Sequence, residues 1–396
     1  MTSGPPSSTP ARASVPLWRD LRVLRIAGQV AVLLVVAIIV AVAARNLLTA
    51  MDQRGLGFGF NFLNRTAGFE IAESPIPYSP TSTYAGAFLT GLLNTLFVSV
   101  VGIVLATLLG LVVGVARLSS NWLVNKIAAG YVELMRNTPL LVQLFIIYFA
   151  VFLQLPGIAE TLRVGDAVFL NQRGAFVPAP QAQPGFGTWL AILAVGVLVA
   201  IGGRALARRR DARGQSTLHL GTVGLVAFLA LAAIGWVATG GPIEFELPVQ
   251  ERFNFVGGLR LSPEFTALLT GLVIYTAAFI GEVVRGGIQA VRRGQLEAAR
   301  ALGLSEGQVL RLIVFPQALR IIVPPMTSQY LNLAKNSSLA IAIGYPDLFK
   351  VGQTMANQTG QPVPVMILVM GTYLAISLVT SLLMNLYNRR VQVLER

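Results

Sequence analysis

Seven polar side chains lie within eleven residues of a segment that is otherwise apolar, near residues 321–343. At helical spacing the amides of Gln329, Asn332 and Asn336 fall on one stripe. Together with the ammonium group of Lys335, they could bind the carboxylate and polar side chain of a small solute. Lipid offers polar groups no hydrogen bonds, so these groups line a solute path, join helices, or sit at the cytoplasmic mouth. The set is Ser328, Gln329, Asn332, Lys335, Asn336, Ser337 and Ser338.

Other polar residues near apolar segments are weaker candidates for the same path. Thr138 and Gln143 lie at the start of an apolar run over residues 139–155. Glu282 and Arg285 are three residues apart, a spacing that favours an ion pair over a substrate site. The expected translocation path therefore consists of Gln329, Asn332, Lys335 and Asn336, with Thr138 and Gln143 as additional candidates.

The residue types argue against catalysis by this chain. Cysteine is absent and histidine occurs once, as His219, so a thiolate or multi-histidine metal site is excluded. A Walker A loop needs Gly-Lys followed by Ser or Thr, yet Lys126, Lys335 and Lys350 follow Asn, Ala and Phe. We expect no catalytic residue, no bound metal and no cofactor.

A second stretch with a clear pattern is QLEAARALGLSEGQVLRLIVFPQALR, residues 295–320. It carries charges that a bilayer core does not tolerate without partners, although apolar segments flank it on both sides. The stretch must therefore lie outside the lipid. Those charges are Glu297, Arg300, Glu306, Arg311 and Arg320.

The same stretch predicts a stiff helix–turn–helix. Residues 295–302 are good helix formers, and Gly303 supplies the left-handed residue that ends a helix. Ser305 and Gln308 have capping-box spacing and begin a second helix, which Pro316 breaks or kinks. A stiff exposed element could transmit motion from a soluble partner to the spans. The alternative is an amphipathic helix that lies on the membrane without a partner.

Composition defines the elements that must position these residues. Apolar residues make up 54% of the chain, charged residues 12%, and the mean hydropathy is +0.68, which indicates an integral membrane protein. We expect an all-α protein with about eight spans, most close to the roughly 20 residues that a bilayer requires. They are predicted near residues 26–44, 88–116, 139–155, 188–203, 218–239, 265–284, 321–343 and 363–387.

The net charge of +13 follows the membrane topology. Most Lys and Arg fall in alternate connecting segments, as the positive-inside rule requires when the N- and C-termini are cytoplasmic. We therefore expect membrane lipid, and no nucleic acid, as the partner of this positive charge. The apolar run after the basic N-terminal residues is longer than an ordinary signal-peptide core, so we expect an anchor rather than a cleaved peptide.

The chain divides by composition into a cytoplasmic tail, an extra first span with its outer loop, two parts of a core, and an inserted helical hairpin with its loops. Small residues recur every fourth position at Gly102, Ala106, Gly110 and Gly114, and predict close helix packing within the chain or between subunits. The divisions are residues 1–25, 26–87, 88–155 (core), 156–264 (insertion) and 265–396 (core), the last with a charged loop at 286–320.

The charged loop resembles the EAA signature of ABC importer permeases, with Phe315 where Leu is usual. The resemblance covers roughly residues 88–155 and 265–390, and is closest to the polar amino acid branch, which carries histidine, glutamate, glutamine, arginine and opines. The extra first span and the insertion resemble the longer permeases of general L-amino-acid transport systems. The matching loop residues are Glu297, Ala298, Ala299, Gly303, Ile313 and Pro316.

This resemblance implies a type I importer permease fold of the MetI-like kind in the bacterial inner membrane. It also implies four partners: a cytoplasmic ABC ATPase dimer that hydrolyses ATP, a second related permease, a periplasmic amino-acid-binding protein and an amino acid substrate. The charged loop would dock on the ATPase. The alternative function is a stand-alone ion-coupled secondary transporter, which the lack of acidic residues near span centres disfavours. A membrane enzyme is a more distant alternative.

Overall fold

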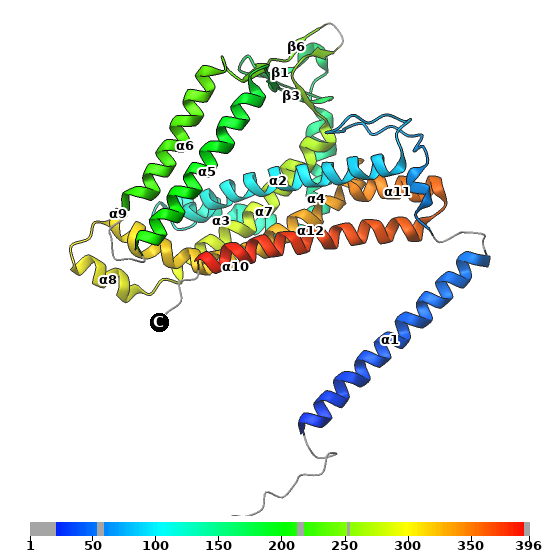
Figure 1. Ribbon diagram of the computed structural model, residues 1–396, viewed down its shortest axis with the longest axis horizontal. Coiled ribbons are helices and arrows are strands. Elements are labelled where there is room, and N and C mark those ends of the chain that lie inside the picture. Colours follow the sequence, from blue (N-terminus) through cyan, green and yellow to red (C-terminus); the bar gives the residue numbers. More distant parts are fainter. Residues whose placement is uncertain (1–20, 54–58, 212–217, 252–253, 392–396) are drawn as a thin grey trace, which may run out of the picture.

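The computed structural model describes residues 21–53, 59–211, 218–251 and 254–391, and shows a bundle of long helices with a small β-structure at one end (Figure 1). Residues 1–20 of the expected cytoplasmic tail and residues 212–217 of the expected insertion lie outside these ranges. The longer helices are α1 (Leu21–Gln53), α2 (Tyr84–Ala116), α3 (Trp122–Asn137), α5 (Phe186–Asp211), α6 (Leu218–Ala238), α7 (Pro263–Gln289), α10 (Phe315–Asn336), α11 (Leu348–Thr359) and α12 (Pro362–Val391).

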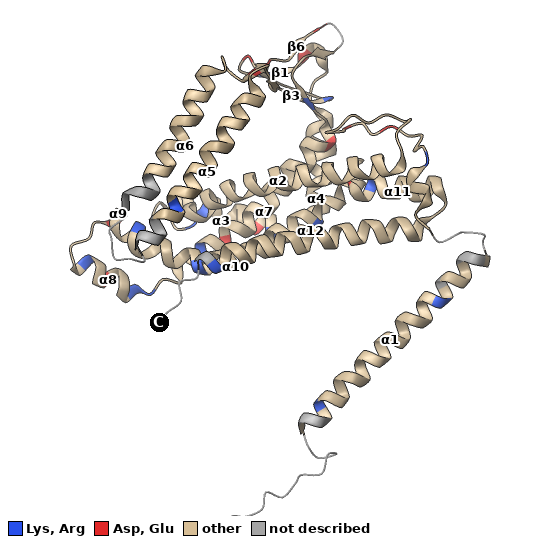
Figure 2. Cartoon of the chain, viewed as in Figure 1, with Lys and Arg blue, Asp and Glu red and all other residues tan. Residues whose placement is uncertain are grey.

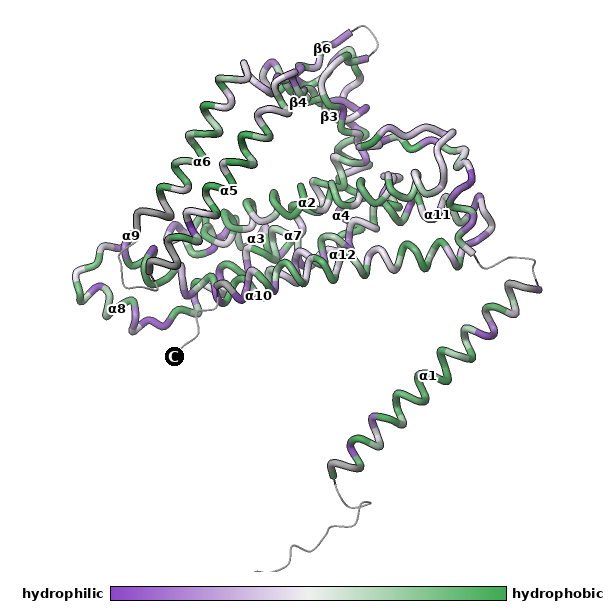
Figure 3. The backbone as a smooth tube through the Cα atoms, viewed as in Figure 1, coloured by the Kyte–Doolittle hydropathy of each residue, from purple (hydrophilic) through white to green (hydrophobic). Residues whose placement is uncertain are grey.

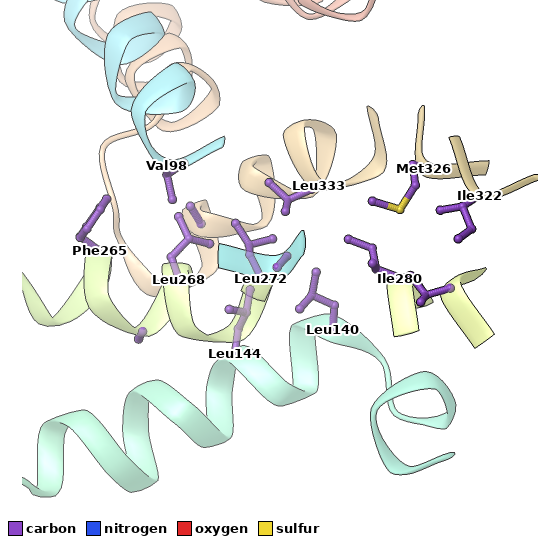
Figure 4. Packing of buried hydrophobic residues seen from close by; sticks show 14 of the residues in the cluster. Val98, Leu140, Leu144, Phe265, Leu268, Leu272, Ile280, Ile322, Met326 and Leu333 are labelled. Carbon is purple, nitrogen blue, oxygen red and sulfur yellow. The ribbon is translucent and has the colours of Figure 1, made fainter. Parts of the chain in front are cut away.

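Helices α2, α7 and α10 form the centre of the bundle. Each of the first two begins at a hydroxyl cap: Thr83 accepts a hydrogen bond from the Gly86 amide, and Ser262 accepts one from the Phe265 amide. The apolar faces of these helices meet in a core whose side chains are almost completely shielded from solvent (Figure 4). Fully buried members of this core include Val98, Leu144, Leu268, Leu272, Ile280 and Leu333.

The small residues of α2 allow α7 to approach closely. A Cβ atom built on Gly110 would lie 2.5 Å from Cγ2 of Ile280, and one built on Gly114 would lie 2.7 Å from Cβ of Val284. Ala106 is completely buried in the same row. The structure therefore confirms that this face packs within the chain.

The expected span over residues 139–155 is half of a bent pair. Helix α3 ends at Asn137 and is followed, after Pro139, by α4 (Leu140–Phe145) and a π-helical segment (Ile146–Val151), with an angle of 105° between the two halves. Pro139 cannot continue the preceding helix because it lacks an N–H and restricts the residue before it. The second half is too short to cross a bilayer alone.

Six helices of the described part are long and apolar enough to cross a membrane, or seven if the bent pair counts as one. The span expected over residues 218–239 is α6 (Leu218–Ala238), of which the shorter stretch Val223–Ala238 is an apolar helix. Charged residues gather mostly at the ends of the long helices (Figure 2), and α1, α2 and α5 are hydrophobic along most of their length (Figure 3). The six are Leu24–Ala50, Tyr84–Ala116, Phe186–Leu206, Pro263–Gln289, Glu306–Ile343 and Pro362–Arg389.

The connections on either side of α5 and α6 form antiparallel strands that the sequence analysis treated as loops. One sheet has the order β1-β2-β3-β8, and the pairs β4-β5 and β6-β7 complete the structure. The rings of Phe169, Phe176 and Phe255 form a small buried cluster, in which Phe176 stacks on Phe255. The strands are β1 (Leu162–Val164), β2 (Val168–Asn171), β3 (Gly174–Val177), β4 (Ala179–Ala182), β5 (Ile243–Glu246), β6 (Val249–Gln250), β7 (Phe255–Val256) and β8 (Leu259–Leu261).

Helices α5 and α6 pack against each other and diverge from the central bundle (Figure 1). Gly196 lies against Phe228, and Gly224 lies against the backbone of Ala200. Within Phe186–Leu206, only 6% of the most apolar stretch is buried against other parts of the chain. Most of its apolar surface is therefore available to lipid or to another subunit.

The segment before α2 is docked on the bundle. Phe62, in a short 3₁₀ helix over Asn61–Asn64, is 1% exposed and packs in a cluster with Leu348, Val351 and Met355. A carboxylate oxygen of Glu73 accepts a hydrogen bond from the Ser262 amide at 2.8 Å. This segment therefore connects α2, α7 and α11.

Candidate coupling loop and translocation path

The charged loop forms two short helices at one end of the bundle, α8 (Arg293–Ala301) and α9 (Glu306–Val309). Ala299 is 3% exposed and belongs to the central core, whereas Glu297 and Ala298 face solvent. One side of α8 therefore packs on the bundle, and the other side is exposed to solvent. Its position at the far end of the bundle is visible in Figure 1.

The turn between these helices has the geometry that the sequence predicts. Gly303 has φ of +79°, in the left-handed region, and Ser305 and Gln308 form the capping box. Arg300 Nε donates to Oε1 of Glu306 at 2.8 Å, which joins α8 to α9 across the turn. Leu302 is 82% exposed at this turn. The loop is thus stiff and carries an apolar residue at its tip.

The expected break at Pro316 is absent. Helix α9 continues through a π-helical segment (Leu310–Val314) into α10, and the candidate span runs from Glu306 to Ile343 without interruption. Pro316 lies in the first turn of α10, directly after the π-helical segment, which accommodates its missing N–H. Ile313 packs against the central core. Movement of the turn is therefore connected directly to α10.

The polar residues of α10 occupy two settings. Asn332 and Lys335 are exposed, whereas Gln329 and Asn336 are half-buried. These two lie four residues before and three residues after Leu333, which is completely buried against α2. The exposed Asn332 and Lys335 therefore point away from the core of this chain. Because lipid cannot satisfy amide and ammonium groups, this surface needs a polar cavity or another subunit.

Thr138 and Gln143 lie at the bend between α3 and α4. The amide nitrogen of Gln143 donates to the carbonyls of Met135 and Thr138, at 2.9 and 3.0 Å. The Thr138 hydroxyl donates to the Leu134 carbonyl at 2.9 Å. These donors therefore bind backbone carbonyl groups at the C-terminal end of α3, and they are not available to a solute.

The sequence analysis did not identify Asp347, a buried carboxylate that caps the N-terminus of α11. It is completely buried, accepts a hydrogen bond from the Lys350 amide at 2.8 Å, and accepts another from the Tyr373 hydroxyl at 3.0 Å. Burial raises the pKa of Asp347 to about 6. The signal available in the sequence was the N-cap pattern of Gly344, Pro346 and Asp347 before an amphipathic helix.

We expect Asp347 to make stability depend on pH. Between its ordinary pKa and about 6, folded protein binds the proton more tightly than unfolded protein, so stability falls as pH rises through this window. Asp347→Asn should weaken this dependence between the ordinary pKa of 3.8 and about pH 6, and Asp347→Ala should cost about 1–3 kcal/mol through lost hydrogen bonds. Thermal unfolding of each variant in detergent measures both effects. The exposed Asp166→Asn is the control, and an equal slope in Asp347→Asn would contradict the assignment.

Glu282 and Arg285 form the ion pair that their spacing predicts. Nε of Arg285 donates to both carboxylate oxygens of Glu282 at 3.1 Å, and Nη2 of Arg117 lies 3.4 Å from Oε2 of the same group. The cluster joins the C-terminal end of α2 to α7 at the same end of the bundle as the charged loop.

The fold defines a class of protein: a membrane component with several apolar spans. Residues 102–393 match the family model described as a binding-protein-dependent transport system inner membrane component. The chain belongs to this family, and it is a multi-pass inner-membrane permease of the ABC importer type. Its members are the membrane part of such systems, and ATP hydrolysis is done by a separate ATPase.

Curated relatives extend over nearly the whole chain. It is 43% identical to the putative amino-acid ABC transporter permease YhdX of Escherichia coli, over 92% of this chain and 94% of the relative. It is 43% identical to the general L-amino acid transport system permease AapQ of Rhizobium johnstonii, over 89% and 88%. It is 40% identical to the glutamate/glutamine/aspartate/asparagine permease BztB of Rhodobacter capsulatus, over 95% and 96%. A solved amino acid ABC transporter with histidines matches with a TM-score of 0.47 and 22% identity, over 78% of this chain and 95% of that chain.

Proposed function

We propose that this chain is the permease subunit of an ATP-driven, binding-protein-dependent importer of polar L-amino acids. The relatives that match nearly all of its length are amino acid permeases, and the substrate class follows from them. The partners are a cytoplasmic ATPase dimer, a second related permease and a periplasmic amino-acid-binding protein. Both termini lie in the cytoplasm, in agreement with the distribution of Lys and Arg.

The observation that carries the proposal is the stiff turn between α8 and α9. Its buried Ala299 fixes it to the bundle, and the exposed Leu302 offers an apolar contact to a soluble partner. Glu297, Ala298, Gly303, Ile313 and Pro316 complete this coupling loop. The helix that follows the turn continues directly into α10, so displacement of the loop reaches the path residues.

The cycle proceeds by conformational change. ATP binding brings two ATPase subunits together, the coupling loops move with them, and the spans change from inward-facing to outward-facing. Hydrolysis then resets the arrangement. The path lies along the exposed stripe of α10, where Gln329, Asn332, Lys335 and Asn336 contact the amino acid between this chain and the second permease. Thr138 and Gln143 hold the bend beside it.

Gentle purification of the tagged chain from its own membrane tests this proposal. We expect mass spectrometry to identify an ABC ATPase and a second permease in near-equal amount. Gly303→Trp, discussed below, provides a variant that should release the ATPase and keep the second permease. A chain that is purified alone, or only with copies of itself, would contradict the coupling function and favour an ion-driven transporter.

Asn332→Leu should reduce uptake without weakening the binding of the ATPase to this chain. The substitution removes a polar contact of about 0.5–1.5 kcal/mol from the path, so we expect an increase in the KM of uptake of about three- to tenfold. Radiolabelled amino acid uptake into cells measures this change, and co-purified ATPase provides the control. Unchanged uptake kinetics would remove Asn332 from the path.

A further inference from the structure

Residues 69–79, in the segment before α2, form a flap on a closed base. At the base, the Ala67 amide donates to the Ser82 carbonyl at 2.8 Å, and the Gly68 amide donates to the Pro80 carbonyl at 2.9 Å. Gly68 has φ of +71°, a left-handed conformation in which the chain turns from the base into the flap. The two ends of the flap are therefore held together by one short ladder.

Glu73, in the middle of the flap, joins parts of the chain that are far apart in sequence. Its backbone carbonyl accepts a hydrogen bond from Nδ2 of Asn94 on α2 at 2.9 Å. Its Oε1 accepts one from the amide of Ser262, the N-cap of α7, at 2.8 Å. The same Nδ2 of Asn94 donates to the carbonyl of Pro346, in the turn before α11, at 2.8 Å. The flap thus connects the N-terminal part of α2 to the beginning of α7.

The apolar contacts of the flap are partial. Phe69, Ile71 and Tyr78 pack on the cluster that contains Met355, but each of the three is only half-buried. The Tyr78 hydroxyl donates to the Phe69 carbonyl at 2.9 Å, so this bond lies within the flap and does not hold it to the bundle. A segment with few buried contacts opens locally at a lower free energy than the core. The flap is therefore the part of this junction that is able to open.

The carboxylate of Glu73 makes the contact with α7 adjustable. Partial burial raises the pKa of Glu73 above its ordinary value of 4.5, and the neighbouring Glu264 of α7 adds to the increase. The hydrogen bonds with Ser262 and the charge of Arg260 oppose the increase without cancelling it. An ionised Glu73 therefore closes the flap less tightly than a neutral side chain of the same shape would.

We propose that the flap is a latch between α2 and α7, and that Glu73 sets how tightly this latch closes. A closed flap stabilises the arrangement of helices seen here, and an open flap releases the Asn94 and Ser262 donors, so that the two helix ends can separate. The inference does not rest on the proposed function, because every contact that it uses lies within this chain.

Protonation of Glu73 should tighten the latch. The closed flap binds the proton more tightly than the solvated, open flap, so closure is strongest below pH 4.5 and weakens as the pH rises above 4.5 through the raised pKa. Glu264 of α7 and Arg260 of β8 face Glu73, and so does Tyr345, which also faces Asp347. Asp347 titrates in an overlapping range, and Glu73→Gln leaves its contribution in place. The difference between the two pH profiles therefore isolates Glu73.

The test is the mobility of a nitroxide spin label on the flap of the full-length chain in lipid nanodiscs. The chain contains no cysteine, so Ala72→Cys, at an exposed position beside Glu73, provides a single attachment site. We expect Glu73→Ala to increase the ratio of mobile to immobile label at least about fivefold, because the Ser262 amide loses its acceptor. Glu70→Ala removes an exposed carboxylate from the same flap and is the matched control, with an unchanged spectrum.

Glu73→Gln separates the charge from the contact. Its amide oxygen can still accept from Ser262, so we expect a closed flap that lacks the contribution of Glu73 to the pH profile. A label at the exposed Asn64, in the base, should keep the same mobility in all variants. The proposal is overturned if Glu73→Ala leaves the flap closed, if Glu73→Gln opens it as far as Glu73→Ala does, or if wild type and Glu73→Gln share one pH profile. None of these measurements requires an ATPase or a substrate, so the importer proposal is tested separately.

Discussion

Gly303→Trp is expected to reduce uptake by at least tenfold while the protein remains in the membrane at its normal level. Gly303 has φ of +79°, and a left-handed conformation costs an L-residue about 1–2 kcal/mol. No atom lies within 4 Å of a Cβ built there, so the fold has room for a side chain. The indole instead changes the shape of the exposed turn beside Leu302. Uptake and co-purified ATPase, measured together, report the loss of coupling.

Gly303→Asn is the matched control for this experiment. Asn adopts the left-handed conformation more readily than other non-glycine residues, and its side chain is small. We expect most of the uptake to remain in this variant. Normal uptake in Gly303→Trp would contradict the assignment of the turn as the coupling element.

The second large effect is expected for Gly110→Ala, in the contact between α2 and α7. The new Cβ would lie 2.5 Å from Cγ2 of Ile280 and 3.1 Å from the carbonyl oxygen of Ala277. The helices must separate to admit it, at a cost of about 1–3 kcal/mol. A lower unfolding temperature in detergent, and less protein in the membrane, measure this loss.

Gly130→Ala provides the same substitution without the contact. Gly130 lies on α3 and is exposed, and no atom is within 4 Å of its added Cβ. Ala stabilises a helix by up to about 1 kcal/mol relative to Gly, so this variant should unfold at an equal or higher temperature. Equal unfolding temperatures for the two variants would contradict the close packing of α2 on α7.

The amino-acid sequence allowed prediction of the local features of the coupling loop. Gly303, the Ser305 capping box and the pairing of Glu282 with Arg285 depend on residues a few positions apart, and each was found as expected. Of the break or kink predicted at Pro316, the break is absent. A proline interrupts the hydrogen-bond ladder, but only the surrounding helix decides whether the result is a break or a π-helical segment.

The membrane class, the family signature and the small-residue face of α2 were determined by the sequence alone, because composition and helical periodicity are local properties. Tertiary structure decided the rest. Strand β3 pairs with β8 across more than eighty residues, and the buried Asp347 accepts a hydrogen bond from Tyr373 of α12. Each depends on contacts between segments distant in the chain, and the spacing of residues along the sequence contains no record of such contacts.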